Sequence, residues 1–349
     1  MKRILIAWLT VFSLILPLAS CGERVTAQPP KTRQYYEYFN TVSVVYSYRG
    51  DTDAEFAAAC SAVEGVLGRL HRLYDIYYEY SGTNNLATVN RLAGREAVEV
   101  DAEIIDLLEY AKEIYTLTGG RTNVMLGAVT RLWHDCREEA RDYPDRARVP
   151  CADELRAAAE HVSIDSLVID REAGTVYISD PEASLDVGAL GKGYATELAA
   201  QALRELGLDS YVLNIGGNLA AIGRKPNGDG WRTSIRDPHE AGGYSATIEL
   251  ADSSLVTSGD YERYYTVGGV RYHHLIDPAT LMPARYFSSV SVLCRDSALA
   301  DALSTALFCM PAEQGRELVR SLEGVKAYWI TPEGDEYMTE GFRPVQLGE

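Results

Sequence analysis

The chain is short of positive charge. It has 33 Lys and Arg residues against 50 Asp and Glu, which gives a formal net charge of −17 at pH 7. This balance excludes non-specific binding to nucleic acid, because a polyanion is repelled at long range. Any phosphate-binding site must therefore be local, and we expect it to combine backbone N–H groups, a few cations and a metal ion.

Long apolar runs are also scarce, and the clearest one lies at the N-terminus. Lys2 and Arg3 precede an apolar run over 4–18, which is short for a membrane-spanning helix. The run ends in Leu18-Ala19-Ser20-Cys21, so we predict a secretory signal over 1–20 with a lipobox and lipidation of Cys21. A plain cleaved signal and a membrane anchor are the alternatives.

The predicted signal has two consequences for the mature chain. Loss of Lys2 and Arg3 with it would take the net charge from −17 to −19. Residues 21–34, which contain Gln28-Pro29-Pro30, then read as a flexible tether. We expect a lipoprotein anchored at the cell membrane and facing the periplasm or the exterior.

The cysteine pattern excludes two kinds of site. No Cys-x-x-Cys occurs, so neither a zinc knuckle nor a thiol redox pair is supported. Five cysteines follow Cys21, and an odd number outside the cytoplasm leaves at least one unpaired. Cys136 and Cys151 flank a charged insert and are candidates for a disulfide, whereas Cys309 lies in an apolar run that predicts a buried thiol.

Internal repeats, low-complexity tracts and a strict β-α-β alternation are all lacking. Strands and helices are mixed, which predicts an α+β fold of mixed sheets packed with helices, forming one large catalytic unit over 35–349. Hydrophobic periodicity and capping residues predict helices over 53–78, 101–118, 153–161, 192–206, 297–308 and 312–322. They predict strands within 35–48 and over 167–169, 175–178, 184–187, 211–214, 219–222, 325–330 and 337–339.

A glycine-lysine turn connects one predicted strand to one predicted helix. It reads Asp186-Val187-Gly188-Ala189-Leu190-Gly191-Lys192-Gly193-Tyr194. Two residues separate Gly188 from Gly191 and no Ser or Thr follows Lys192, so it is neither a P-loop nor a Rossmann fingerprint. A turn of this kind serves as a packing device as often as it binds an anion.

Two further segments carry possible ligands. Asp301 and Thr305 share one face of a predicted apolar helix, and their hard oxygens suit Mg²⁺ together with a backbone carbonyl and ligand phosphates. The alternative is a solvent-facing Asp with an ordinary Thr. Gly216-Gly217 follows a predicted buried strand, and its amides either approach a ligand or form a plain hairpin turn.

Two adjacent histidines precede an Asp-Pro turn at Asp277. His273 and His274 are suited to acid–base chemistry or to metal binding. Neighbouring side chains in a strand point to opposite faces, so the two rings cannot easily share one metal ion. We expect one ring to face a site and the other to lie in the core or at the surface.

Taken together and in order, these segments resemble the ApbE family of FAD:protein FMN transferases. The resemblance runs from about Tyr36 to Pro332 and implies an ApbE-like, T-fold-like architecture. It is carried most strongly by Leu185–Tyr194, Asn214–Asn218, Trp231–Pro238, Thr257–Tyr264, His274–Pro278 and Ala300–Leu307.

The resemblance implies an activity, cofactors and partners. Family members split the diphosphate of FAD, attach FMN to a Thr or Ser hydroxyl of a target protein, release AMP and need Mg²⁺. The acceptor here would be a membrane or periplasmic redox protein. The alternatives are a periplasmic lipoprotein that binds FAD without transfer and a Mg²⁺-dependent FAD pyrophosphatase that gives FMN and AMP.

The resemblance also implies roles for individual residues. Asp301, Thr305 and the Ala189 carbonyl would hold the metal, and His274 would take the acceptor's proton with Asp277 as its orienting group. Contacts to FAD would come from Phe39, Arg121, Thr122, Asn123, Asp186, Lys192, Gly216, Gly217 and Leu275.

Two segments depart from the family pattern. Arg121-Thr122-Asn123 replaces Ala-Phe-Asp, and Phe39-Asn40-Thr41 replaces Met-Gly-Thr, so FAD affinity or ligand choice is expected to differ.

Overall fold

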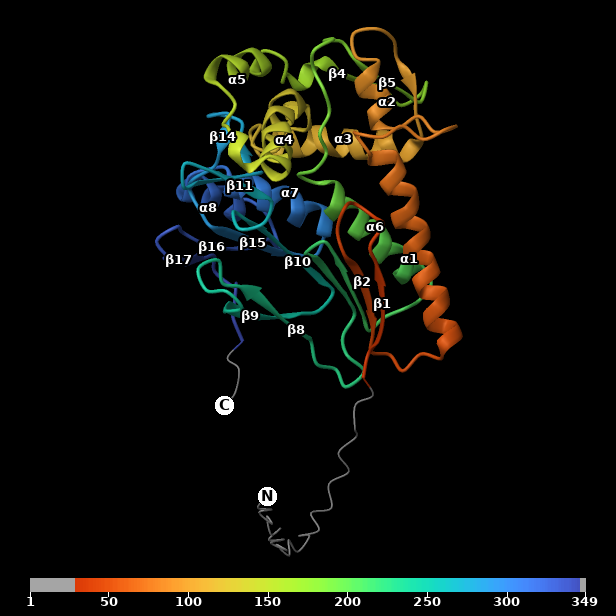
Figure 1. Ribbon diagram of the computed structural model, residues 1–349. Helices are drawn as coiled ribbons and strands as arrows, with labels where there is room; N and C mark the ends of the chain where they lie inside the picture. The colour runs from red at the N-terminus through yellow and green to blue at the C-terminus, as the bar shows by residue number, and fades with distance from the viewer. Residues whose placement is uncertain (1–28, 346–349) are drawn as a thin grey trace, which may run out of the picture.

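A computed structural model describes residues 29–345 and shows a large antiparallel sheet covered by helices on one face (Figure 1). The predicted signal and Cys21 lie outside the described residues. Within that part of the chain, no helix is both long and apolar enough to span a membrane. The eight strands are, in sheet order, β1 (Lys31–Tyr35), β2 (Ser43–Ser47), β6 (Tyr211–Ile215), β7 (Asn218–Ile222), β10 (Ser253–Gly259), β15 (Ser289–Cys294), β16 (Lys326–Ile330) and β17 (Glu336–Met338).

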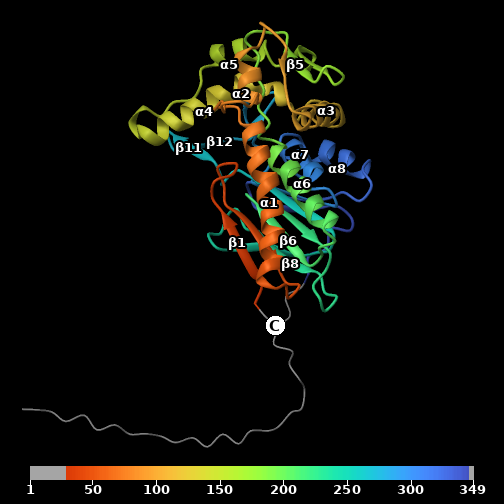
Figure 2. The same cartoon turned by 90° about the vertical axis from the view of Figure 1, so that its right-hand side faces the viewer.

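Helices cover one face of this sheet in two layers (Figure 2). The helices α6 (Gly191–Glu205) and α7 (Ser297–Phe308) pack directly on the strands, and α1 (Asp53–Tyr74) packs on α6. α1 begins at a capping box in which Thr52 and Glu55 satisfy each other's backbone N–H groups. α8 (Ala312–Arg320) buries Val319 in the same core as Trp329 of β16. The hairpin of β8 (Trp231–Arg236) and β9 (Tyr244–Leu250) shares a core with side chains of β10 and β16.

A smaller layer lies beyond the end of the large sheet, above it in Figure 1. It contains α2 (Leu86–Arg91), α3 (Ala102–Leu117), α4 (Gly127–Asp142), α5 (Ala152–Ala159), β3 (Val98–Glu99), β4 (Leu167–Asp170) and β5 (Thr175–Ile178). Short 3₁₀ turns occur at Val124–Leu126, Pro144–Arg146 and Ile164–Ser166. Two short hairpins complete the fold: β11 (Tyr264–Val267) with β12 (Val270–His273), and β13 (Ile276–Asp277) with β14 (Met282–Pro283).

The predicted α+β class is confirmed, and several element boundaries are corrected. The tether predicted over 21–34 is too long, because Lys31 already pairs with Ser47 in the sheet. The strand predicted within 35–48 is two antiparallel strands joined by residues 36–42. The first helix ends at Tyr74 rather than 78, and the residue that caps α7 is Asp296.

The strand predicted over 184–187 does not form, and the candidate disulfide between Cys136 and Cys151 is absent. Residues 184–187 belong to no strand, and the Asp186 N–H donates to the Val124 carbonyl instead. All five cysteines in residues 29–345 are free thiols. Cys136 is buried on α4, whereas Cys151 is exposed and accepts a hydrogen bond from the Glu154 N–H at the start of α5. Cys309 is buried, as predicted.

Candidate active site

One cleft of about 1030 Å³ lies where the helical layer meets the end of the large sheet, and it gathers nearly all of the predicted site residues. It is lined from both layers, by side chains that are far apart in the sequence. The predicted residues that line it are Phe39, Arg121, Thr122, Asn123, Asp186, Ala189, Lys192, Gly216, Gly217, His274, Leu275, Asp301 and Thr305. Asp277 lies outside the lining, and Cys21 lies outside the described residues.

The glycine-lysine turn and α7 meet inside this cleft. The Asp301 side chain is buried, and its Oδ2 accepts a hydrogen bond from the Gly193 N–H at 2.7 Å. The same oxygen lies 3.3 Å from Asn218 Nδ2 and 3.6 Å from Lys192 Nζ. A buried carboxylate is tolerated because these donors and the ammonium group compensate its charge.

Gly193 is a packing residue. A Cβ atom at this position would lie 2.3 Å from Asp301 Cβ and 2.5 Å from the Ser297 carbonyl oxygen. Glycine therefore lets the first turn of α6 approach α7 closely enough for the Asp301 carboxylate to reach the helix start. The turn thus serves packing, one of the two alternatives that the sequence left open, and it also positions the Asp301 carboxylate.

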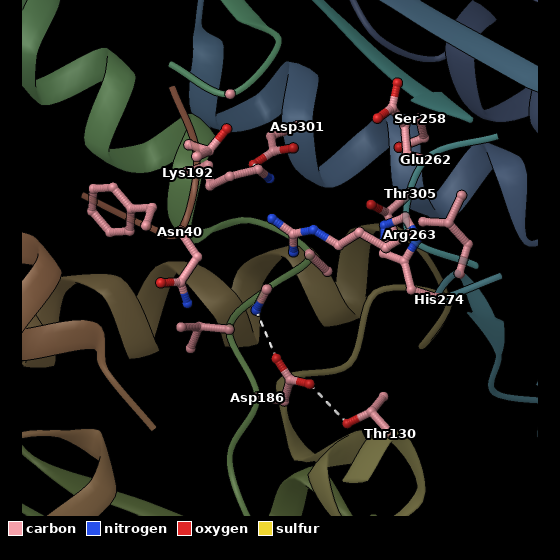
Figure 3. Close-up of a pocket in the computed structure, with 18 of the residues that line it drawn as sticks. Asn40, Thr130, Asp186, Lys192, Ser258, Glu262, Arg263, His274, Asp301 and Thr305 are labelled. Carbon is pink, nitrogen blue, oxygen red and sulfur yellow. Dashed lines mark hydrogen bonds and ion pairs between the residues drawn. The ribbon is translucent and has the colours of Figure 1, made fainter. Parts of the chain in front are cut away.

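Asp186 shapes the other side of the turn. Its Oδ1 accepts from the Gly188 N–H at 2.8 Å, and its Oδ2 accepts from the Thr130 hydroxyl at 2.7 Å (Figure 3). The carboxylate therefore ties the turn to α4. It still lines the cleft.

The two histidines face different surroundings. His273 is buried, with its Nε2 2.8 Å from the Ala284 carbonyl oxygen, and burial lowers its pKa to about 4. His274 lines the cleft, and its Nδ1 is buried without a hydrogen-bond partner in the described chain. Burial, followed by the charge of Arg263, lowers the pKa of His274 to about 3. Its imidazole is therefore neutral at pH 7.

Asp277 does not orient His274. Its carboxylate is 1% exposed, and its Oδ1 accepts hydrogen bonds from Arg121 Nη1 at 2.8 Å and from the Ala279 N–H at 2.9 Å. Arg121 also donates to the Cys309 carbonyl at 3.1 Å. Arg121 thus ties the Asp277 turn to the end of α7, a role that an alanine at position 121 does not offer.

Thr122 and Asn123 follow Arg121 in the segment that departs from the family pattern, and their side chains also form hydrogen bonds within the protein. Thr122 is buried, and its hydroxyl donates to the Ala302 carbonyl of α7 at 2.9 Å. Asn123 donates to the Val162 carbonyl and accepts from the Met125 N–H. These side chains therefore hold the cleft wall in place.

The loop around Phe39 has left-handed backbone, which favours glycine. The φ angles are 54° at Phe39 and 50° at Asn40, and Asn is among the few non-glycine residues that tolerate this region. Gly216 is also left-handed, with φ of 57°, and a Cβ there would lie 2.7 Å from the Thr41 side chain. The two loops therefore pack against each other at the cleft edge.

Sequence reasoning missed part of the site. Arg263 lines the cleft on the same side as His274 and Thr305, facing Lys192 and Asp301 (Figure 3). No acidic side chain in residues 29–345 forms an ion pair with it. Trp133 and Arg137 reach the cleft from α4, a helix that was not predicted. Its buried residues Val129, Trp133, Cys136 and Ala140 follow a helical spacing that would have revealed it.

Comparison with known proteins agrees with this architecture. The family model described as "ApbE family" matches residues 40–329. The FAD:protein FMN transferase of Treponema pallidum (strain Nichols) is 33% identical over 338 residues, which cover 92% of this chain and 89% of that protein.

Solved structures show the same fold. An ApbE protein from Thermotoga maritima superimposes with a TM-score of 0.78 at 27% identity, covering 90% of this chain and 98% of that one. The apo flavinyl transferase ApbE of Pseudomonas stutzeri gives a TM-score of 0.74 at 27% identity, covering 90% and 95%. This chain belongs to the ApbE family.

Proposed function

We propose that this chain transfers FMN from FAD to a Thr or Ser hydroxyl of a target protein and releases AMP. Its similarity to FAD:protein FMN transferases supports the proposal. The observation that carries it is the buried Asp301 carboxylate beside Lys192, at the start of α6 and inside a cleft of about 1030 Å³. That volume is at the upper end of small-molecule pockets and suits a dinucleotide.

The diphosphate of FAD would lie at the start of α6. At the start of this helix the Gly191 N–H donates to the Val187 carbonyl and the Gly193 N–H to Asp301, which leaves the Lys192 N–H and the positive end of the helix dipole for a ligand. Lys192 adds a full positive charge, and Arg263 adds another across the cleft. These groups favour a diphosphate in a chain whose net charge is −17.

A Mg²⁺ ion fits the donor set next to this position. Asp301 Oδ1 receives no hydrogen bond from residues 29–345, and the Thr305 hydroxyl lines the cleft one helical turn away. Mg²⁺ takes few protein ligands and completes its shell with water and phosphates, so this small donor set suits it. Asp301, Thr305 and the Ala189 carbonyl would hold it. When bound, it would neutralise charge on the diphosphate.

His274 would accept the proton of the acceptor hydroxyl. Its imidazole is neutral at pH 7, and the negative charge of bound FAD would raise its pKa from about 3 toward the range of an effective base. The hydroxyl oxygen forms a bond to the phosphorus of the FMN half, and the bond from that phosphorus to the bridging oxygen breaks. AMP leaves with the bridging oxygen, and the proton passes to the imidazole.

We also propose that the protein acts as a lipoprotein attached to a membrane through Cys21. The sequence over 1–21 supports this location, and the expected acceptor is a membrane or periplasmic redox protein.

One incubation separates this function from its alternatives. The protein is mixed with FAD, Mg²⁺ and a Thr-containing acceptor domain, and the products are resolved on a denaturing gel and by chromatography. Covalent flavin fluorescence in the acceptor together with AMP supports the transferase. AMP and free FMN without labelling indicate a pyrophosphatase, and bound, unchanged FAD indicates a binding protein. Full activity in excess EDTA would contradict the metal assignment.

A further inference from the structure

A second cavity, of about 1060 Å³, opens from the side of the cleft between α4 and β11. We call it the side groove. It shares a wall with the cleft. The residues that line both cavities are Asn40, Tyr77, Tyr78, His134, Arg137, Glu262, Arg263 and Tyr265. Residues that line only the side groove are Glu138, Ala140, Arg141, Pro144, Ala147, Tyr264 and Thr266. A ligand in the side groove would therefore reach the cleft beside Arg263.

The β11 strand presents an unpaired edge. It is joined to β12 by Gly268-Gly269, whose φ angles of 57° and 82° match a two-residue type I′ hairpin. In such a hairpin the flanking pair, Val267 and Val270, exchanges hydrogen bonds, and bonded and non-bonded pairs then alternate. The backbone groups of Tyr264 and Thr266 consequently point away from β12. No residue in 29–345 hydrogen-bonds to them.

Exposed tyrosines surround this groove. Tyr77, Tyr78 and Tyr264 are 55%, 71% and 44% exposed, and all three line it. Large exposed aromatic side chains with neighbouring arginines are the composition of protein-binding hot spots. A free strand edge next to such side chains binds extended peptides by adding a strand to the sheet.

The charge of the side groove is opposite to that of the whole chain. Its lining contains the arginines 137, 141 and 263 against the glutamates 138 and 262. Glu262 forms an ion pair with Arg236 and Arg141 forms one with Asp142, and because both of these partners lie outside the groove the balance stays at one positive charge. The groove is therefore locally positive on a chain with a net charge of −17, and it favours an acidic segment over a basic one.

We infer that the side groove binds the acceptor polypeptide as an extended segment that pairs with the β11 edge and carries an acidic residue near its reactive hydroxyl. The segment would enter along α4 and place its Thr or Ser at the shared wall, next to Arg263 and His274. This inference rests on the proposed function and specifies how the acceptor reaches the same cleft.

The test uses the full-length protein and two fluorescent twelve-residue peptides. Each peptide has one central Thr, flanked by Asp in one and by Lys in the other. Binding is measured by fluorescence polarisation without FAD, and transfer is measured with FAD and Mg²⁺. The Asp peptide should bind more tightly and show the lower KM. Equal or weaker binding of the Asp peptide would overturn the charge argument.

Two pairs of variants locate the binding surface. Thr266→Pro removes the outward N–H from the strand edge, whereas Thr266→Val keeps it. Arg141→Glu reverses a groove charge. Arg156→Glu is its matched control, because both arginines are exposed and form an i,i+3 ion pair, with Glu138 and Asp153 respectively.

Thr266→Pro and Arg141→Glu should each weaken binding of the Asp peptide about threefold to tenfold, the effect of one lost hydrogen bond or charge contact. Both controls should bind as the wild type does, and FAD affinity should be the same in all. Equal peptide binding by wild type, Thr266→Pro and Arg141→Glu would overturn the inference, as would absence of peptide binding. Peptide binding that follows this pattern without any FMN transfer would instead support the groove and contradict the proposed function.

Discussion

The ion pair between Arg121 and Asp277 gives a prediction whose size follows from its burial. Asp277 is 1% exposed at the side chain and Arg121 is 22% exposed, with 2.8 Å between Nη1 and Oδ1. Removing one partner of a buried pair costs about 3–5 kcal/mol, because the remaining charge stays buried without compensation. In Arg121→Ala the Asp277 carboxylate still accepts a hydrogen bond from the Ala279 N–H, and water can approach it from the partly exposed position of the lost Arg121 side chain. We therefore expect Arg121→Ala to lower the free energy of unfolding by about 3 kcal/mol.

A double-mutant cycle separates the charge effect from lost packing. In Arg121→Ala/Asp277→Asn no buried charge remains, so the loss should shrink to about 1 kcal/mol, a rescue of about 2 kcal/mol relative to Arg121→Ala, and Asp277→Asn alone completes the cycle. The assay is urea denaturation at pH 7 followed by tryptophan fluorescence. As a matched control, Arg91→Ala removes an exposed ion pair with Glu79 of the same 2.8 Å length and should cost less than about 1 kcal/mol. Equal losses for Arg121→Ala and Arg91→Ala, or no rescue in the double variant, would refute the reasoning.

Three further predictions concern the site and its support. Asp301→Asn keeps an oxygen that accepts from the Gly193 N–H, so the fold should persist. FAD turnover, measured as AMP release, should fall about 100-fold or more. Turnover near that of the wild type would exclude Asp301 from the site. Gly193→Ala should unfold at lower urea than the wild type, because its Cβ meets Ser297 and Asp301, whereas Gly65→Ala in α1 meets nothing within 4 Å and should be neutral or stabilising. His273 has a pKa of about 4 in the fold against 6.5 unfolded, so only the unfolded chain binds a proton between these values. The contribution of neutral His273 to the free energy of unfolding is complete above pH 6.5 and falls by about 3 kcal/mol toward pH 4. Urea denaturation across this range should show that the free energy of unfolding changes less steeply with pH in His273→Gln than in the wild type. An unchanged pH dependence would contradict the assignment of this pKa to His273.

Local sequence signals predicted the elements that are stabilised locally. Asp101 caps α3, and Thr118 with Gly119 ends it, as expected from capping chemistry. The strands around Gly216-Gly217 were found because an apolar run and a glycine turn define a hairpin. α4 was missed because its outer face carries many charges that mask the apolar stripe facing the core.

The errors arise where partners distant in sequence decide the structure. Residues 184–187 have a strand-like pattern, but the Leu185 N–H donates to Asn90 Oδ1 and the Asp186 N–H to Val124, so no strand pairs with them. The resemblance predicted that Ala189, Lys192, Asp301 and Thr305 share one site, and all four line the same cleft, although each motif alone allowed a plain structural reading. The pairing of Arg121 with Asp277 was not predictable, because it depends on how the α3–α4 connection packs against the end of α7.

FMN transfer in this cleft would leave FMN joined to an acceptor hydroxyl as a phosphate ester. The direct measurement is intact and peptide mass spectrometry of a Thr-containing acceptor domain after incubation with the protein, FAD and Mg²⁺. We expect a mass increase of FMN less one water on a single Thr or Ser, equimolar with the AMP released, and no increase with Asp301→Asn. An unmodified acceptor beside released AMP, or an unmodified acceptor with intact FAD, would contradict it.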